Sequence, residues 1–360
     1  MSQKIAIFHN FMDNIGGAEI LSLTLARELK ADIYSTNVDE DKIAKMGFAD
    51  VKVRSIGKVP LNAPFKQQLS LLRFRWLKLK DKYDFFIISG DWAMAGAVNH
   101  HPNLWYVHSP IREIWDLYEY TRQNMVSGWK RPIFDLWVYF NRFLNLRYIK
   151  HVDQITCNSR NTQNRVKKYL GREASIINPP IEIKDFKNEG FGDYWLSVNR
   201  LIGHKRVEIQ LEAFAGLPQE KLIIVGSYEE SVHFQDYANR IKKLKPANVE
   251  IKSWVTHDEL VKLYNNCRGF ITTAKDEDFG MTVVEAMAAG KPVIAPNEGG
   301  YKESVVNGVT GILIDEINSA KVIEAIKKIS PQAQSYEKAC LAQAQKFDTK
   351  VFINKIKELS

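Results

Sequence analysis

Short apolar runs alternate with amphipathic segments of helical length along most of this chain. The runs are rich in β-branched or aromatic residues and are followed by polar or glycine-containing loops, which predicts strands. The predicted strands are Ile5–Phe8, Phe85–Ser89, Leu104–Val107, Ile155–Cys157, Trp195–Val198, Leu222–Val225, Gly269–Thr272 and Val293–Ala295. Apolar residues three and four positions apart predict surface helices at Ala18–Leu29, Ser159–Leu170 and Val207–Phe214. This alternation predicts parallel sheets covered on both faces, and therefore the α/β class.

The charged, glycine-containing stretch from Pro179 to Asp193 interrupts the alternation, and a buried-strand pattern resumes directly after it. A length of 360 residues suits two domains of ordinary size. We therefore predict two doubly wound, Rossmann-like domains. The predicted bounds are 1–180 for the N-terminal domain, 181–192 for a linker, 193–345 for the C-terminal domain and 346–360 for a C-terminal helix. The pattern leaves open where that last helix docks.

Composition narrows the class of protein. The hydrophobic fraction of 45% and the charged fraction of 26% are those of a soluble globular chain, which excludes a disordered protein. The three cysteines lie far apart without a CxxC pair, which excludes a disulfide scaffold and a zinc site and fits a reducing compartment. The first residues do not have the pattern of a signal peptide, and no run reaches the roughly eighteen apolar residues of a membrane-spanning helix. We therefore expect a cytoplasmic protein, and its net charge of +8 indicates an anionic partner.

Three loops carry the candidate chemistry. In open parallel sheets, ligands bind past the carboxyl ends of the strands, so two facing domains create a central cleft lined by such loops. The first loop, after Ile5–Phe8, contains Gly16 and Gly17, which permit close backbone approach, and the helix from Ala18 offers free N–H groups to an anion. A plain tight turn is the alternative. The loop lacks a GxGxxG pattern, which argues against a nicotinamide cofactor.

The second loop follows the first strand of the C-terminal domain. In SVNRLIGHKRVEI, Arg200 and Lys205 flank a glycine-containing turn that leads into a helix. Two cations beside a helix N-terminus form a clamp for a diphosphate, with the guanidinium bidentate and the ammonium acting as a point charge. We expect the following helix to direct Arg206 toward solvent. The alternative interpretation of the loop is a solvated basic turn.

The third loop follows Gly269–Thr272. Glu277 lies in this loop, Phe279 and Gly280 close it, and Glu285 lies about one turn inside the next predicted helix. Ionised carboxylates only accept hydrogen bonds, so the two glutamates can hold different hydroxyl groups of one ligand. An acidic residue placed for the helix dipole would explain Glu285, but it would not explain the glycine loop. The backbone amides that we expect to face an anion or sugar oxygens are those around Gly280, Met281 and Thr282.

These motifs together resemble the retaining glycosyltransferases of family 4, the group 1 glycosyltransferases, and in particular their mannosyltransferase-like members. The residues that carry the resemblance are EDFGMTVVEAMAAGKPVIA with its Glu-x7-Glu spacing, NRLIGHKRVEIQLEAF and GGAE. The resemblance implies the GT-B fold, which consists of two Rossmann-like domains. It also implies a nucleotide-diphosphate sugar as donor substrate, GDP-mannose being favoured, with no separate cofactor and no metal ion, and a saccharide or lipid-linked saccharide as acceptor.

The resemblance also implies roles for individual residues. Glu285 would bind the ribose and Glu277 the transferred sugar, while Arg200 and Lys205 would neutralise the leaving diphosphate. Gly16 and Gly17 would line the donor phosphates and the acceptor side of the cleft. His108, in WYVHSP, would contact the sugar or act in catalysis, and a structural histidine is the alternative. The further donor-binding residues would be Phe279, Gly280, Met281 and Thr282.

Two segments of the N-terminal domain, 65–83 and 129–151, are basic with interleaved aromatic residues. Such helices can lie in an anionic membrane interface, so we predict peripheral association with the inner face of the membrane. The alternative is an ordinary amphipathic helix with its charges in water. No recognised motif supports binding to nucleic acid.

Two other functions stay open at this point. One is a GT-B transferase that uses a UDP-sugar to make another glycoconjugate. The other is a non-catalytic, glycosyltransferase-like protein that binds a glycan or a partner. The cations and glutamates of the two C-terminal loops argue against a binding module, because such a module needs no diphosphate clamp.

Overall fold

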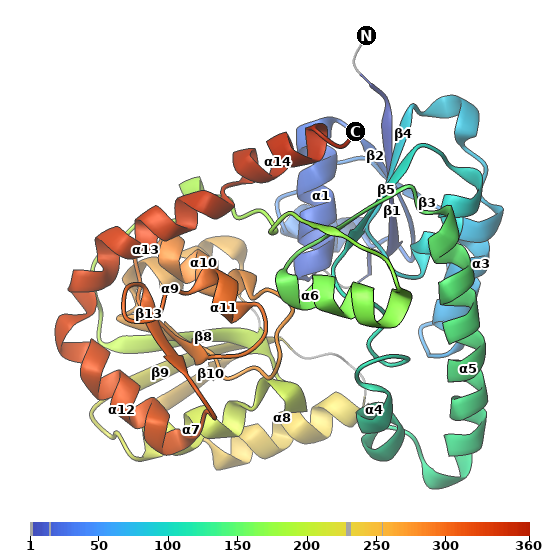
Figure 1. The fold of residues 1–360 in the computed structure, drawn as a ribbon. Helices are drawn as coiled ribbons and strands as arrows, with labels where there is room; N and C mark the ends of the chain where they lie inside the picture. The colour runs from blue at the N-terminus through green and yellow to red at the C-terminus, as the bar shows by residue number, and fades with distance from the viewer. Residues whose placement is uncertain (1–2, 14–15, 228–231, 254) are drawn as a thin grey trace. The chain divides into compact units, whose positions relative to one another are not determined.

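The computed structural model describes residues 3–13, 16–227, 232–253 and 255–360. These residues form two compact units, coloured along the chain in Figure 1. The N-terminal unit comprises Met1–Asn178 together with Phe352–Ser360, and the C-terminal unit comprises Pro179–Val351. Each unit contains one parallel sheet with helices on both faces. The predicted α/β class and the two doubly wound sheets are therefore confirmed.

The sheet of the N-terminal unit has the strand order β3-β2-β1-β4-β5-β6-β7, and all its pairs are parallel. The order reverses between β1 and β4. Ile5 and Ile7 of β1 face one core cluster, while Ala6 and Phe8 face the other, which is why this strand is apolar at successive positions. The strands are β1 Ile5–Phe11, β2 Asp32–Thr36, β3 Val53–Ser55, β4 Phe85–Ile88, β5 Asn103–Val107, β6 Gln154–Cys157 and β7 Ser175–Ile176.

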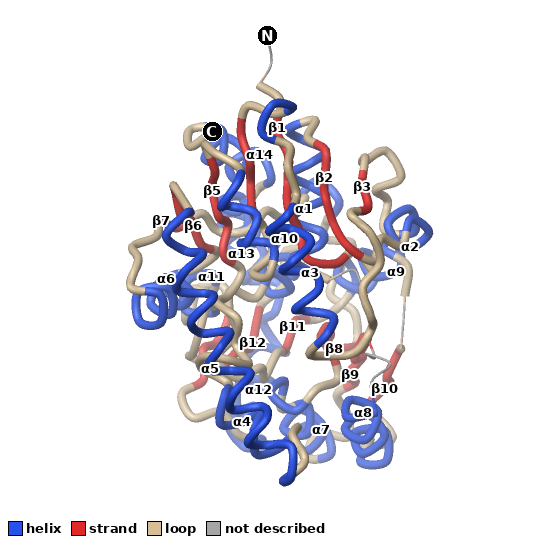
Figure 2. Tube along the Cα trace, turned by 90° about the vertical axis from the view of Figure 1, so that its right-hand side faces the viewer, coloured by secondary structure: helices blue, strands red, loops and turns tan. Residues whose placement is uncertain are grey.

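Helices cover both faces of this sheet. Two of them, α3 and α5, lie side by side on the outside of the unit (Figures 1 and 2), joined by a hydrogen bond of 2.7 Å from Gln68 to Asn141. The helix predicted at Ser159–Leu170 changes type along its length. The α-helix α6 ends at Arg165, and the chain continues as a π-helical turn over Val166–Leu170. The helices of this unit are α1 Gly17–Leu29, α2 Glu40–Lys45, α3 Phe65–Trp76, α4 Tyr118–Asn124, α5 Arg131–Tyr148, α6 Arg160–Arg165 and, from Phe352 onward, α14 Thr349–Lys357.

The sheet of the C-terminal unit has the order β10-β9-β8-β11-β12-β13, again parallel throughout, and reverses between β8 and β11. One core cluster, centred on Trp195, Phe214 and Phe270, fills the space between sheet and helices. The strands are β8 Tyr194–Arg200, β9 Lys221–Ser227, β10 Val249–Lys252, β11 Gly269–Ile271, β12 Val293–Pro296 and β13 Gly311–Ile314. The helices are α7 Val207–Ala215, α8 Val232–Leu244, α9 His257–Asn266, α10 Met281–Ala288, α11 Tyr301–Ser304, α12 Ser319–Ile329 and α13 Glu337–Ala344.

The unit boundary differs from the predicted domain bounds at both ends. Residues 181–192, which we expected to form a linker, instead pack on the core of the C-terminal unit: Ile181 is buried there, and Phe186 and Phe191 pack against it. The Lys291 ammonium reinforces this packing by donating to Asn188 (2.6 Å) and to the Gly190 carbonyl. At the other end, α14 leaves the C-terminal unit and buries Phe352 in the N-terminal core, edge-on to Tyr106.

Because Phe352 is buried in a closely packed cluster, we expect the substitution Phe352→Ala to lower the free energy of unfolding of the N-terminal unit by about 3 kcal/mol or more. The neighbouring substitution Val351→Ala, at a side chain that is 37% exposed, should cost about 0.5 kcal/mol or less. Urea denaturation of both variants measures the difference. Equal stabilities of the two variants would contradict the docking of α14 on this unit.

Candidate functional site

The two cationic and acidic loops of the C-terminal unit meet where its strand order reverses. The loop after β8 contains the short 3₁₀ turn Gly203–Lys205, and the loop after β11 contains Glu277. Backbone contacts hold the loops together: Thr273 donates its hydroxyl to the Lys205 carbonyl (2.8 Å), and the Lys275 amide donates to the His204 carbonyl (2.8 Å). Residues more than seventy positions apart in sequence are thereby brought to one edge of the sheet.

An ion pair lies at this meeting point. Lys205 Nζ donates to Glu277 Oε2 at 2.5 Å, and the two side chains are only 12% and 23% exposed. Burial by itself would raise the pKa of Glu277, but the charge and hydrogen bond of Lys205, with the charges of His204 and Arg200, lower it below its ordinary value. Glu277 is therefore ionised at neutral pH. Arg200, exposed at the end of β8, is close enough for its charge to act on this carboxylate.

Arg206 does not point to solvent, so that expectation is wrong. Its guanidinium donates to the carbonyls of Thr273 (2.7 Å) and Ala274 (3.3 Å) and to Glu298 (2.6 Å). The backbone of Arg206 has a positive φ of 49°, which turns the chain just before α7 and directs the side chain back under the loop. Arg206 thus braces the loop that holds Glu277, while its neighbour Lys205 pairs with Glu277 itself.

The glycine that closes the loop meets a steric requirement. Gly280 has a φ of 86°, and a Cβ atom there would lie 2.4 Å from a ring carbon of Tyr301. Phe279, which we predicted to bind the donor, is buried and packs edge-on against Phe347 at a centroid distance of 5.4 Å. Only its backbone can therefore face a ligand. Gly280 caps α10 without a side-chain bond, and Met281 and Thr282 begin that helix, whose first amides have no intrahelical acceptor.

Glu285 lies in the second turn of α10 and has a different electrostatic environment from Glu277. The buried hydroxyl of Tyr264 donates to Glu285 Oε2 at 2.7 Å. Burial raises the pKa of Glu285, and the Tyr264 hydrogen bond and the His257 charge, which lower it, do not offset burial. Glu277 is thus held in its charged form by the Lys205 cation, whereas Glu285 is held by the neutral hydroxyl of Tyr264.

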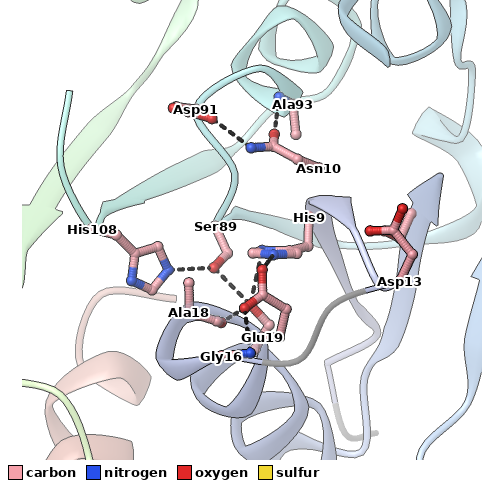
Figure 3. Close-up of polar contacts among 12 residues, drawn as sticks. His9, Asn10, Asp13, Gly16, Ala18, Glu19, Ser89, Asp91, Ala93 and His108 are labelled. Atoms are coloured by element: carbon pink, nitrogen blue, oxygen red, sulfur yellow. Dashed lines mark hydrogen bonds and ion pairs between the residues drawn. The ribbon is translucent and has the colours of Figure 1, made fainter. Parts of the chain in front are cut away.

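The predicted residues of the N-terminal unit lie beside the reversal between β1 and β4 (Figure 3). Gly16 caps α1, and its amide donates to Glu19 Oε2 at 2.8 Å; Gly17 is the first residue of the helix. Asn14 and Ile15, which precede them, lie outside the described residues.

His108 follows β5, with its ring Nε2 2.8 Å from Ser89 Oγ. Burial and the charge of His9 lower the pKa of His108 to about 3, although the charge of Glu19 acts in the opposite direction. The His108 ring is therefore neutral at physiological pH. Its backbone carbonyl already accepts hydrogen bonds from Asn158 (2.8 Å) and Thr162 (3.3 Å), which leaves the ring as the part of His108 that can reach a ligand.

Comparison with known proteins finds a family match in the C-terminal unit. Residues 181–346, almost the whole C-terminal unit, match the family described as glycosyl transferases group 1. Over these residues, a little under half of the chain, the sequence therefore resembles the group 1 glycosyltransferases. The resemblance carried by the Glu-x7-Glu and GHKR motifs is thereby confirmed, and the chain is a glycosyltransferase.

Relatives of this glycosyltransferase extend the likeness beyond one unit. An uncharacterized glycosyltransferase of Methanocaldococcus jannaschii is 28% identical over 178 residues, which is 49% of each chain. The alpha-1,3/1,6-mannosyltransferase ALG2 of Dictyostelium discoideum is 27% identical over 382 residues, covering 86% of both chains. Among solved structures, HepE of Anabaena in complex with UDP-glucose has a TM-score of 0.77 at 19% identity and covers 99% of both chains, which supports the GT-B fold.

The structure brings together only some of the predicted residues of the glycosyltransferase. Lys205 and Glu277 are in contact, while Glu285 is held by Tyr264. Gly16, Gly17 and His108 belong to the other unit. In the described ranges, no three side chains of the metal-binding types are grouped closely enough to hold an ion.

Sequence reasoning missed several polar residues of the N-terminal unit. His9 directly follows the predicted strand Ile5–Phe8, Ser89 ends the predicted strand Phe85–Ser89, and Glu19 is the acidic residue of GGAE. A position at or just past the end of a strand was the signal that could have found them. Glu113 was also missed; burial and the charges of Asp91 and Asp116 raise its pKa to about 7.

We expect substitution of the two glutamates to affect stability differently at pH 7. Glu277→Gln leaves the largely buried Lys205 ammonium without its counter-ion and should lower the free energy of unfolding by about 1–3 kcal/mol. Glu285→Gln removes a carboxylate whose charged form is disfavoured and keeps an acceptor for Tyr264, so stability should not fall.

The pH dependence of stability gives a second test, at Glu277. Because its pKa is lowered, Glu277 stabilises the fold above its ordinary pKa of 4.5, and this contribution is lost as the pH falls through the lowered value. The deficit of Glu277→Gln should therefore shrink in thermal melts below pH 4.5. Equal destabilisation of both variants at pH 7 would contradict this assignment.

Proposed function

We propose that this glycosyltransferase transfers mannose, with retention of anomeric configuration and without a metal ion, from GDP-mannose to a saccharide or lipid-linked saccharide in glycan biosynthesis. The likeness to a mannosyltransferase over 86% of the chain supports the sugar. The observation that carries the chemistry is the contact between Lys205 and Glu277, because it brings a cation and a carboxylate to one sheet edge beside the N-terminus of α10.

Charge development explains how this edge would act. Cleavage of the bond between the anomeric carbon and the diphosphate leaves negative charge on the diphosphate. Lys205, Arg200 and the first amides of α10 are groups that stabilise such charge, and fixed groups do so without reorganising. Two cations in this place supply the neutralisation that a divalent ion would otherwise give. Glu277 is acceptor-only when ionised, so it is suited to hydroxyl groups of the transferred sugar.

Glu285 is suited to the nucleoside. Tyr264 fixes one of its carboxylate oxygens and leaves the other for a ligand. A carboxylate that is oriented in this way accepts from the vicinal hydroxyls of a ribose. The division of labour between the two glutamates is the testable part of this proposal.

We expect Glu285→Ala to weaken binding of GDP, and Glu277→Ala to leave GDP affinity nearly intact while transfer falls, because the two carboxylates would hold different parts of the donor. Lys205→Ala should lower turnover by roughly 10²-fold or more through loss of charge stabilisation at the leaving group. Lys221→Ala is the control, since Lys221 pairs with Asp193 at an exposed position. Calorimetry with GDP and with UDP, and transfer assays in excess chelator, are the measurements.

Four results would count against the proposal. Tighter binding of UDP than of GDP would favour the UDP-sugar alternative, and full dependence on added Mg²⁺ or Mn²⁺ would reject metal independence. Weakened GDP binding in Glu277→Ala alone would reverse the two roles. A folded Lys205→Ala protein with normal turnover would reject the diphosphate clamp.

We also propose that the protein is cytoplasmic and associates peripherally with the inner, anionic face of the membrane, and α5 supplies the surface. The buried face of α5 includes Asn141 and Asn145, whereas its exposed face is apolar. The segment 129–151 carries five lysines and arginines against one aspartate. Two of these cations, Arg131 and Arg142, donate to backbone carbonyls within the unit. The exposed apolar side chains of α5 are Ile133, Leu136, Tyr139, Phe140, Phe143 and Leu146.

The other basic segment, 65–83, is less available for contact with a membrane than its sequence indicates. In α3, Phe74 is fully buried. Lys66 pairs with Asp13 at 2.9 Å, and the Arg73 guanidinium donates to the carbonyls of Ile56 and Lys58. These groups are already used within the N-terminal unit, so the membrane contact that we propose centres on α5. No helix within the described residues is long and apolar enough to span a bilayer.

We expect the double substitution Leu136→Asp/Phe140→Asp to lower partitioning onto anionic vesicles by about tenfold or more, because two exposed apolar side chains would no longer enter the interface. Leu244→Asp, at a similarly exposed leucine of α8, should leave partitioning unchanged. Binding should weaken at 1 M salt, where the Debye length is about 3 Å. Co-sedimentation measures both effects. Absence of wild-type binding, or equal loss in both variants, would reject this surface.

A further inference from the structure

A chain of hydrogen bonds connects the Glu19 carboxylate to the His108 ring where the strand order of the N-terminal unit reverses (Figure 3). Glu19 Oε1 lies 3.0 Å from His9 Nε2, and His9 Nδ1 lies 3.2 Å from Ser22 Oγ. Ser22 Oγ lies 2.7 Å from Ser89 Oγ, which lies 2.8 Å from His108 Nε2. We call Glu19, His9, Ser22 and Ser89 the polar chain.

The inner members of the polar chain must satisfy one another. His9, Ser22 and Ser89 are at most 3% exposed, so water has little access to them. They come from β1, α1 and the end of β4, and the chain ends at His108, after β5. Three strands and one helix therefore fix its geometry.

The charge of Glu19 sets the direction of the hydrogen bonds. Burial would raise the pKa of Glu19, but the hydrogen bond and charge of His9 and the Gly16 amide lower it below its ordinary value. An ionised carboxylate only accepts, so His9 Nε2 must donate to Glu19. His9 Nδ1 then either accepts from Ser22 or, if the ring is charged, donates to it.

The proton of Ser22 determines the direction of the next hydrogen bonds. Its hydroxyl has one proton, and three acceptors are in reach: His9 Nδ1, Ser89 Oγ and the Ala18 carbonyl at 2.8 Å. A carbonyl only accepts, so the contact with Ala18 takes the Ser22 proton, and Ser22 can then only accept from Ser89. The Ser89 proton is then used, and Ser89 must accept from His108 Nε2. The His108 ring therefore carries its proton on Nε2 and presents the Nδ1 lone pair.

We propose that the polar chain holds the neutral His108 ring with its proton on Nε2, so that Nδ1 accepts a hydrogen bond from a sugar hydroxyl. Its four members are positioning residues. The identity of the ligand rests on the proposed function, but the proton's place on the ring does not. A neutral ring with an outward lone pair repels phosphate and carboxylate oxygens, so it selects a hydroxyl. In this assignment His108 contacts the hexose and not the diphosphate.

The experiment measures the ring directly by ¹⁵N NMR on protein labelled at histidine, with the His108 signals assigned by their loss in His108→Phe. In the wild type we expect the proton on Nε2, Nδ1 unprotonated, and an Nε2–H resonance protected from exchange with water. Ser89→Ala should abolish that protection. Ser22→Ala, one link further away, should reduce it and serves as a second variant should Ser89→Ala fold poorly.

The matched control is Ser35→Ala. Ser35 is a fully buried serine on the neighbouring strand β2, and its hydroxyl donates to the Thr36 carbonyl, outside the polar chain. This variant should keep the Nε2–H resonance and normal turnover. Ser89→Ala should lower kcat about tenfold or more, as loss of an outer partner of a functional histidine does, with GDP affinity unchanged.

A His108 proton on Nδ1 in the wild type, or an Nε2–H resonance that persists in Ser89→Ala, would overturn the inference. These NMR results do not depend on turnover. If the predicted spectra are found in a protein that transfers no mannose, the proposed function fails and the inference about His108 stands. If mannose transfer is normal but the Nε2–H signal is missing, the inference about His108 fails and the proposed function stands.

Discussion

The reversal of strand order within each parallel sheet is the constraint on which the candidate site depends. Parallel strands bring all their carboxyl ends to one edge, and the loops on the two sides of a reversal diverge to opposite faces. The reversal lies between β1 and β4 in one unit and between β8 and β11 in the other. Because the diverging loops leave this part of the edge uncovered, polar side chains from distant segments meet there: Glu19, His9 and Ser89 in one unit, Lys205 and Glu277 in the other.

The two edges differ in electrostatic character. The C-terminal edge carries full charges, with Lys205 and Arg200 acting on an ionised Glu277. The N-terminal edge carries a neutral histidine whose orientation depends on a carboxylate at the far end of a buried hydrogen-bonded chain. A diphosphate requires fixed positive charge, whereas a sugar hydroxyl requires a directed neutral acceptor. Under the proposed function, the units are thus suited to different parts of a nucleotide sugar, in agreement with the match of residues 181–346 to glycosyl transferases group 1.

The outer helices α3 and α5 show that tertiary contacts decide which side chains of a basic, aromatic segment remain exposed. In α3, Lys66 pairs with Asp13 and Arg73 donates to backbone carbonyls, so the charge of these two side chains serves the fold. In α5, polar Asn141 and Asn145 face inward, Asn141 toward Gln68 and Asn145 toward Trp115, and large apolar side chains remain outside. Val138 is buried beside these asparagines, and Phe134 and Trp137 pack against the same cluster, so the exposed apolar side chains of α5 are not needed to hold the helix in place.

Periodicity and loop chemistry by themselves determined the α/β class, the two parallel sheets, the inner strands and the loops that carry Lys205, Glu277 and Glu285. Inner strands such as Ile5–Phe8 are apolar on both faces and stand out in the sequence, whereas edge strands such as Val249–Lys252 face water on one side and do not. Only the tertiary structure decided that Lys205 and not Arg206 meets Glu277, that Phe279 belongs to the core, that α14 returns to the N-terminal unit, and that Ser89 holds His108. The physical reason is the same in each case: these outcomes depend on partners far away in the chain, and periodicity within one segment carries no information about which distant segment will cover it.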